Sequence, residues 1–131
     1  MLDICQYNYY PIWHKYIDTQ DGYILDIYRI PGPRPESLTT ALGKVTSREP
    51  VLMVHGLFGT SLSYILNGPG LAPAFKLADT GRYDVWLLNL RGNEFSRKHN
   101  FYDPDITKDY WEFSFEEMGD YDLTTAVSYI L

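Results

Sequence analysis

The first residues whose types and spacing could take part in a reaction are a histidine and a glycine directly after a short apolar run. His55-Gly56-Leu57 follows the run Val51 to Val54. A tight turn at a strand end releases backbone N–H groups, and such groups can point into a cavity and stabilise an oxyanion. A plain β-turn explains the same residues equally well. From this segment alone, oxyanion binding and an ordinary turn are equal alternatives.

A second candidate is the segment from Asn89 to Ser96, with the sequence Asn-Leu-Arg-Gly-Asn-Glu-Phe-Ser. It follows the next apolar run, Tyr83 to Leu90, at the position where α/β sheets place ligand-binding loops. Arg91 carries five donors in a rigid fork, so it can hold two strand-end loops together. We predict a structural role for Arg91 and no direct catalytic role; a solvated arginine is the alternative.

The segment Gly59 to Ser63 begins like the Gly-x-Ser-x-Gly nucleophile elbow of serine hydrolases. Its fifth residue is Ser63, whose side chain occupies a place where glycine is needed for close helix–strand packing. We therefore expect Ser61 and Ser63 to cap or line a loop, because the His-Gly-Leu turn already follows the strand.

Composition excludes several classes of protein. The chain has 131 residues, 45% hydrophobic and 21% charged, which is ordinary for a globular domain or part of one. Its net charge is -6 with scattered basic residues, so we expect no nucleic-acid partner. Cys5 is the only cysteine, and the three histidines, His14, His55 and His99, lie far apart in sequence. We expect no metal site and no cofactor.

Neither a leader nor a membrane span is predicted. Met1 to Tyr10 lacks the basic and apolar regions of a signal peptide. Leu57 to Phe75 is uncharged, but glycines, prolines and polar residues interrupt it, so it does not suit a lipid-spanning helix.

The elements that must position these residues follow from the apolar pattern. Trp13 to Asp18 and Tyr23 to Ile30 predict an antiparallel hairpin around the Asp21-Gly22 turn. The prolines from Pro31 onward end it, and a surface loop to Glu49 is expected.

A β-α-β unit is predicted next. Val51 to Val54 reads as a strand buried on both faces, Ala72 to Asp79 as a helix stopped by Gly81, and Tyr83 to Leu90 as a second buried strand. Such a crossover makes the two strands parallel, which predicts an α/β fold. His55-Gly56 and the start of the Asn89 segment would then lie side by side.

The C-terminal part combines a loop and helix. Asn93 to Asp109 is polar and predicts a long loop. Ser114 with Glu117 fits a capping box, although Asp122 could cap a later start if Gly119 breaks the helix. Four residues at helical spacing predict one apolar face: Leu123, Ala126, Val127 and Ile130. The sequence ends on that face, which we interpret as a truncation inside a domain.

Several of these segments occur together in one known family. They are Asp21 to Leu25 with Arg29-Ile30-Pro31, His55-Gly56-Leu57, Leu77-Ala78-Asp79, Tyr83 to Leu87, Asn89 with Arg91-Gly92-Asn93, Ser96 to His99, Trp111 to Phe115, Glu117-Met118 and Tyr121-Asp122-Leu123. In this order the segments resemble the acid lipase family, the α/β-hydrolases of the gastric lipase, lysosomal acid lipase and steryl ester hydrolase type. The resemblance covers the chain from about Tyr10 onward.

The resemblance implies a partial α/β-hydrolase fold: an N-terminal antiparallel hairpin leading into a parallel sheet with crossover helices. Residues 1–131 would be the N-terminal portion of one hydrolase-associated lipase domain, truncated before the nucleophile elbow. The implied activity is lipase or carboxylic ester hydrolase on neutral lipids, triacylglycerol or steryl esters, through a serine acyl-enzyme in lipid degradation. Contact with a lipid interface and a secreted or lysosomal location are implied as well.

The same resemblance assigns one site residue. The backbone N–H of Leu57 would be an oxyanion donor, with His55 and Gly56 shaping its turn, while the catalytic Ser, Asp and His are absent from this chain. The isolated chain should then be inactive. Two alternatives stay open: a non-catalytic truncated relic acting as a binding module, and another α/β-hydrolase chemistry, such as an epoxide hydrolase with an aspartate nucleophile.

Overall fold

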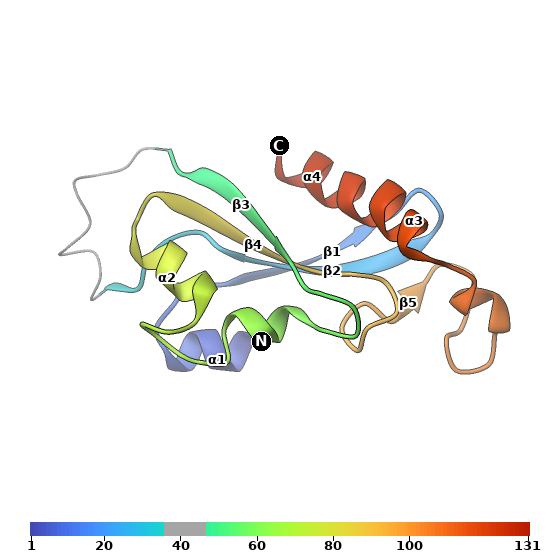
Figure 1. The fold of residues 1–131 in the computed structure, drawn as a ribbon, viewed down its shortest axis with the longest axis horizontal. Helices are drawn as coiled ribbons and strands as arrows, with labels where there is room; N and C mark the ends of the chain where they lie inside the picture. Colours follow the sequence, from blue (N-terminus) through green and yellow to red (C-terminus); the bar gives the residue numbers. More distant parts are fainter. Residues whose placement is uncertain (36–46) are drawn as a thin grey trace. The chain divides into compact units, whose positions relative to one another are not determined.

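The computed structural model describes residues 1–35 and 47–131 (Figure 1). Most of the loop predicted between Pro31 and Glu49 therefore lies outside the described residues. The strands are β1 (Trp13–Asp18), β2 (Tyr23–Ile30), β3 (Glu49–Val54), β4 (Tyr83–Asn89) and the short β5 (Lys98–His99).

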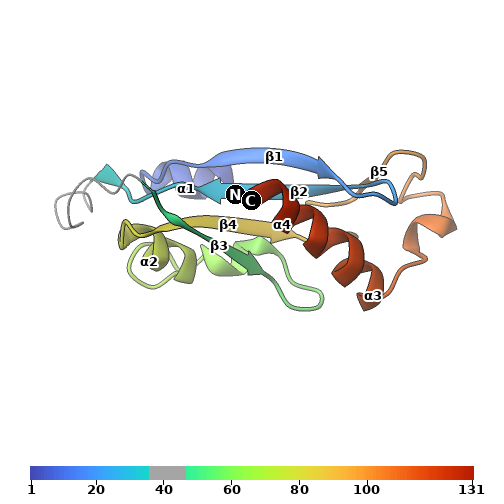
Figure 2. The same ribbon diagram turned by 90° about the horizontal axis from the view of Figure 1, so that it is seen from above.

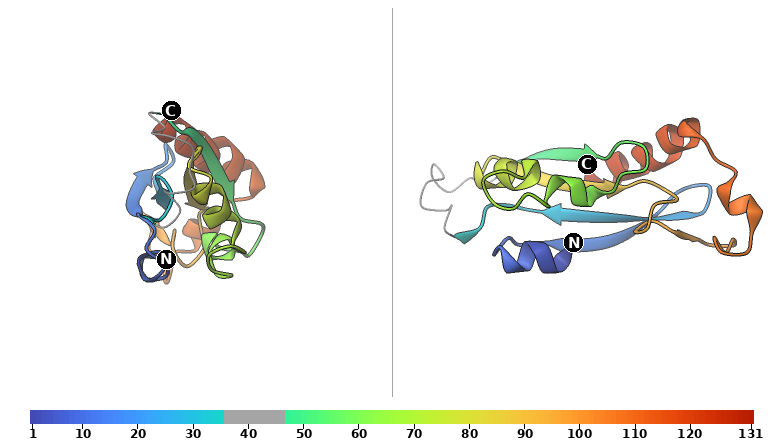
Figure 3. Two further views of the ribbon diagram at one scale, coloured as in Figure 1. Left: turned by 90° about the vertical axis from the view of Figure 1, so that its left-hand side faces the viewer. Right: turned by 60° about the horizontal axis from the view of Figure 1, so that its bottom comes forward.

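One sheet contains all five strands. The order is β1-β2-β4-β3, and β5 pairs antiparallel with the start of β2, Tyr23 opposite His99 (Figures 2 and 3). β1 and β2 run in opposite directions, whereas β3 and β4 run in the same direction (Figure 2). The hairpin, the parallel pair and hence the partial α/β-hydrolase fold are as predicted.

The hairpin turn depends on a glycine. Gly22 has φ +96°, and a Cβ there would lie 3.0 Å from the His99 ring. Its N–H donates to the carbonyl of Thr19, and the N–H of Thr19 donates to the carbonyl of Tyr23. Since L side chains rarely adopt such a φ, glycine is required at this turn.

The prediction that β3 is buried on both faces is wrong. None of its residues is fully buried, and its first two are exposed. β3 is the last strand in the order, so among the described residues a strand neighbours it on one side only. β4, with a strand on each side, is buried from Asp84 to Asn89.

Two short helices flank the strands in sequence: one lies before β1, and the other lies between β3 and β4. α2 (Pro73–Asp79) begins with proline in its first turn, buries Ala74, Phe75 and Ala78, and is followed by Gly81 at φ +70°. This confirms the predicted crossover helix. α1 (Leu2–Tyr7) was not predicted, because six residues with one buried side chain, Cys5, leave little periodic signal.

The predicted C-terminal helix is confirmed, but its interior differs. Ser114 and Glu117 form the capping box at the start of α3 (Phe115–Glu117). A π-helical turn, η4 (Met118–Leu123), joins it to α4 (Thr124–Ile130), so Gly119 does not break the helix. On the predicted apolar face Ala126 is buried, whereas Leu123 and Val127 are 36% and 44% exposed.

The chain divides into two compact units. Unit 1 comprises Met1–His14, Tyr28–Met53 and Ser61–Leu87; unit 2 comprises Lys15–Ile27, Val54–Thr60 and Leu88–Leu131. Each of the four longer strands contributes residues to both. The core of unit 1 consists of Cys5, Tyr10, Tyr28, Ile30, Ile65, Ala72, Ala74, Phe75, Ala78, Val85 and Leu87.

Candidate functional site

Unit 2 contains a cavity of about 730 Å³. One wall is the turn from Val54 to Thr60, and another is the segment from Leu90 to Glu94. The rest of the lining comes from the C-terminal segment: Trp111, Phe113, Phe115, Met118, Gly119 and Leu123. This volume lies within the range typical of small-molecule sites, and the lining is largely apolar.

The His-Gly-Leu turn at this cavity has a strained backbone. The N–H of Gly59 donates to the carbonyl of Gly56 at 2.9 Å, which closes a four-residue turn. Phe58, the third residue, has φ +59° and is 97% exposed. A positive φ at this position belongs to a type II turn and is uncommon for a bulky side chain. Strain of this kind persists only where surrounding bonds hold the turn.

Leu57 occupies the second position of that turn. Its side chain is 57% exposed and lines the cavity. Within residues 1–35 and 47–131, no acceptor is hydrogen-bonded to the backbone N–H of Leu57. The predicted donor thus remains available for a ligand.

Both ring nitrogens of His55 are engaged. Nδ1 lies 2.8 Å from the carbonyl oxygen of Gly56, whereas Nε2 lies 3.1 Å from the N–H of Leu90 and 3.1 Å from Nδ2 of Asn93. A carbonyl can only accept and a backbone N–H can only donate, so these partners assign the proton to Nδ1. The bond to Leu90 also confirms that the His-Gly turn and the end of β4 meet.

A hydrogen-bonded loop follows β4. The carbonyl oxygen of the Asn93 side chain accepts from the N–H groups of Phe95 and Ser96, at 3.0 and 2.9 Å, and its amide donates to Oδ1 of Asn89 at 3.0 Å. Ser96 donates from Oγ to the carbonyl of Asn89 at 2.6 Å and accepts from the N–H of Asp26 at 2.7 Å. These bonds fix the loop that forms one cavity wall.

Arg91 is buried between two carboxylates. Its guanidinium donates to both oxygens of Asp21, at 2.6 and 2.9 Å, and from Nε to Oδ1 of Asp122 at 2.9 Å. The backbone N–H of Arg91 donates to Oδ2 of Asp122 at 2.9 Å. The structural role predicted for Arg91 is confirmed. Its partners differ from those expected, because Arg91 joins the hairpin turn to the C-terminal helix and does not hold two strand-end loops together. The suggestion that Asp122 caps a helix is wrong, because both of its oxygens accept from Arg91.

Burial and charge act in opposite directions in this cluster. Burial raises the pKa of Asp21, but bonds from Arg91 and Thr19 outweigh it and leave that pKa below its usual value. Burial lowers the pKa of Arg91, and the two carboxylates more than reverse this, so its pKa is raised. In Asp122 burial dominates and raises the pKa despite the bonds from Arg91. Arg91 therefore stays charged, and the cluster depends on that charge.

Gly92 brings the loop against the aromatic wall. Its φ is +82°, and a Cβ there would lie 2.7 Å from the ring of Phe113 and 3.3 Å from that of Trp111. This close approach of Gly92 to the two rings leaves no room for any side chain at position 92.

Tyr110 precedes these rings in the same aromatic segment. It is fully buried, and burial raises its pKa to about 12.

The other chemically interesting residues lie outside this cavity. Ser61 is fully buried in η2 (Ser61–Tyr64) of unit 1 and does not line the cavity. His14 and Cys5 also belong to unit 1, and burial raises the pKa of the Cys5 thiol to about 11. Among the described residues, no group of three or more His, Cys, Asp or Glu could hold a metal ion. No helix in the described part of the chain is long and apolar enough to cross a membrane.

Sequence reasoning did not identify Asp21, Asp122 or Trp111 as part of the site. The pairing of Arg91 with Asp21 spans 70 positions and that with Asp122 spans 31, so no local spacing reveals either one. The run of aromatic residues from Tyr110 to Phe115 was the available signal for the cavity wall.

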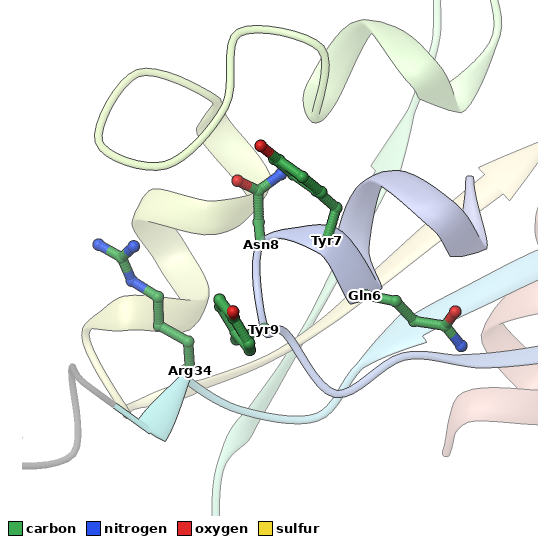
Figure 4. A pocket seen from close by; sticks show the side chains of 5 residues that line it. All are labelled: Gln6, Tyr7, Asn8, Tyr9 and Arg34. Carbon is green, nitrogen blue, oxygen red and sulfur yellow. The ribbon is translucent and has the colours of Figure 1, made fainter.

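A second hollow, of about 420 Å³, lies in unit 1 (Figure 4). It is lined by Gln6, Tyr7, Asn8, Tyr9 and Arg34. Arg34 lies 3.8 Å from Asp79 and faces the ring of Tyr10, and the Asn8 amide donates to the carbonyl of Ile4. The lining residues include no carboxylate, histidine, serine or cysteine.

Comparison with known proteins agrees with the geometry. Residues 1–68 match the family model of the partial α/β-hydrolase lipase region, and residues 49–129 match that of the α/β-hydrolase fold. Gastric triacylglycerol lipase of Rattus norvegicus is 44% identical over 122 residues, which are 93% of this chain. Lipase member K of Homo sapiens is 42% identical and Lipase 1 of Drosophila melanogaster 38% identical, each over 98% of this chain.

These matches cover only part of each relative. The chain spans 29% of the rat lipase, 30% of the human protein and 26% of the fly protein. The His-Gly-Leu turn falls inside both family-model matches, and the Arg91 segment falls inside the second. The chain belongs to the α/β-hydrolase family and carries its lipase region, which confirms the acid-lipase resemblance.

Proposed function

We propose that this chain supplies the oxyanion-binding part of a serine ester hydrolase that acts on neutral lipid esters. One observation carries the proposal: the N–H of Leu57, which has no hydrogen-bond acceptor among the described residues, lies in a turn at the wall of the largely apolar cavity of about 730 Å³. A backbone N–H held in such a site stabilises the negative charge that develops on an ester carbonyl oxygen during acyl transfer.

The remaining steps need residues from outside this sequence. A serine Oγ attacks the ester carbonyl, a histidine takes the serine proton and returns it to the leaving alcohol, and water then hydrolyses the acyl-enzyme. The second oxyanion donor is the N–H after that serine. His55 is unsuited as the general base, because hydrogen bonds occupy both of its ring nitrogens.

The cavity chemistry supports an uncharged substrate. Its ionisable lining residues are His55, Arg91 and Glu94, and Arg91 is already paired with two carboxylates. The aromatic and aliphatic wall favours an acyl chain. The names of the relatives, gastric triacylglycerol lipase among them, support a triacylglycerol, with a steryl ester as the alternative. A secreted or lysosomal location and contact with a lipid interface belong to the same proposal.

We further propose that residues 1–131 are the N-terminal portion of one hydrolase domain whose nucleophile elbow follows Leu131. The coding sequence downstream of Leu131 tests this directly. A Gly-x-Ser-x-Gly motif within a few tens of codons is expected. An in-frame stop in the natural transcript would favour the alternative, a non-catalytic binding module.

The oxyanion role is testable in a chimera in which this chain replaces the matching segment of rat gastric triacylglycerol lipase. Leu57→Pro removes the N–H at a turn position that accepts proline. It should lower kcat on a chromogenic ester by about 10²–10³-fold, whereas Leu57→Ala, which keeps the N–H, should change mainly KM. The 131-residue chain alone should show no turnover. Equal kcat for the two variants, or turnover by the chain alone, would overturn the proposal.

A further inference from the structure

The bond from His55 to Gly56 reaches the same peptide group that carries the proposed oxyanion donor. Nδ1 of His55 donates to the carbonyl of Gly56 at 2.8 Å, and the next atom along the chain is the nitrogen of Leu57. No cis peptide occurs in the described ranges. In a planar trans peptide the C=O and N–H point in opposite directions, so a bond that holds the carbonyl also fixes where the Leu57 N–H points.

The Gly56 carbonyl accepts two hydrogen bonds. Besides His55, the N–H of Gly59 donates to it at 2.9 Å. Donors on a carbonyl polarise the whole amide, which strengthens its own N–H as a donor. The carbonyl is therefore held from two sides, one of them a side chain that can be replaced.

The His55 ring is itself fixed. Nε2 accepts from the N–H of Leu90 and faces the amide nitrogen of Asn93, each at 3.1 Å. The Asn93 side chain cannot turn over without losing the bonds that its oxygen accepts from Phe95 and Ser96. Its amide nitrogen must therefore face the ring, which keeps the imidazole proton on Nδ1.

We propose that His55 is a positioning residue, which orients and polarises the Gly56–Leu57 peptide so that the Leu57 N–H meets the oxyanion. The N–H of Leu90 and the Asn93 amide together set the His55 tautomer in this arrangement. The inference rests on the proposed function, because it takes Leu57 as the oxyanion donor. It adds a side chain to a site otherwise made of backbone.

Two substitutions separate the two bonds of the ring. In His55→Asn the amide nitrogen can replace Nδ1 and keep the bond to Gly56, whereas in His55→Gln the longer amide reaches the place of Nε2 and leaves the Gly56 carbonyl without its side-chain donor. In the rat lipase chimera, His55→Gln should lower kcat by about tenfold or more with KM little changed, a smaller loss than removal of the donor. His55→Asn should restore most of the activity.

The outcomes distinguish this inference from the proposed function. Loss of kcat in Leu57→Pro, with equal kcat in the Asn and Gln variants at position 55, would overturn the positioning role and leave the oxyanion role standing. Unchanged kcat in Leu57→Pro would overturn the proposed function itself. A measurement that needs no variant is nitrogen-15 NMR of the histidine-labelled chimera. A His55 signal of the Nδ1–H tautomer is expected, and the Nε2–H tautomer would contradict the inference.

Discussion

The two units of the chain differ in what they bury. Among its described residues, unit 1 buries two polar side chains, Ser61 and Asp84, beside an apolar core in which the rings of Tyr10 and Phe75 stack at 4.0 Å. The buried polar or charged residues of unit 2 are Thr19, Asp26, His55, Asn89, Arg91, Ser96 and Asp122. Both units bury apolar side chains, but most of the buried polar and charged groups of the described residues belong to unit 2.

This difference separates the interactions that stabilise the fold from those that fix the positions of the cavity loops. Apolar burial contributes about 25 cal/mol per Å² and has no direction, so it stabilises unit 1 without specifying loop geometry. Buried hydrogen bonds add little net free energy, but they tolerate few arrangements. Unit 2 uses them to hold the loops that form its cavity.

Arg91→Ala should have the largest effect on stability, because it removes the cation from the buried polar cluster of unit 2. It leaves the buried carboxylate of Asp122 without its cation and should lower the free energy of unfolding by about 3–5 kcal/mol. Urea denaturation of the chimera measures the loss. Arg97→Ala removes an ion pair to Asp105 with exposed partners and should cost less than about 1 kcal/mol. Similar losses for the two variants would mean that burial of Arg91 has no special role.

Gly92→Ala tests the close approach of loop and aromatic wall. The added Cβ would meet the Phe113 ring at 2.7 Å, and φ +82° adds backbone strain, so a loss of about 2 kcal/mol is expected. Gly119→Ala is the matched control, because nothing lies within 4 Å of its Cβ and it sits in the C-terminal helix. There alanine should stabilise by up to about 1 kcal/mol. A destabilisation at position 119 as large as that at 92 would contradict this view of the wall.

Of the three test substitutions Tyr10→Phe should have the smallest effect, because it removes a polar bond from the apolar unit. The hydroxyl donates to Oδ2 of Asp79 at 2.6 Å, while the ring remains free to stack on Phe75. The expected loss is about 1 kcal/mol, measured by the same denaturation experiment. A loss above that for Gly92→Ala would show that unit 1 also depends on directional bonds.

The elements that the sequence predicts well are those with a local signal. The Asp21-Gly22 turn, the run Val51 to Val54, the helix before Gly81 and the Ser114 capping box each depend on residues close together in the chain. Their positions agree with the structure to within a few residues. The oxyanion role that the resemblance to acid lipases implies for the His55 turn stays a prediction.

The features that were missed depend on residues distant in sequence. β5 exists because Lys98 and His99 pair with the start of β2, and a two-residue strand has no periodicity to detect. Exposure of β3 follows from its place in the strand order. Asp122 looked like a helix cap because a short polar residue near a glycine suits that role equally well, and only the position of Arg91 decides against it.

Arg91 and its two carboxylates also limit how the protein can diverge. A change at position 91 alone leaves two carboxylates without their cation, and a change at 21 or 122 alone leaves guanidinium N–H groups without their acceptor, so we expect few single substitutions to be tolerated at these positions. The three codons, far apart in the gene, therefore behave as one inherited unit. Sequences descended from a common ancestor should keep all three residues or exchange them together.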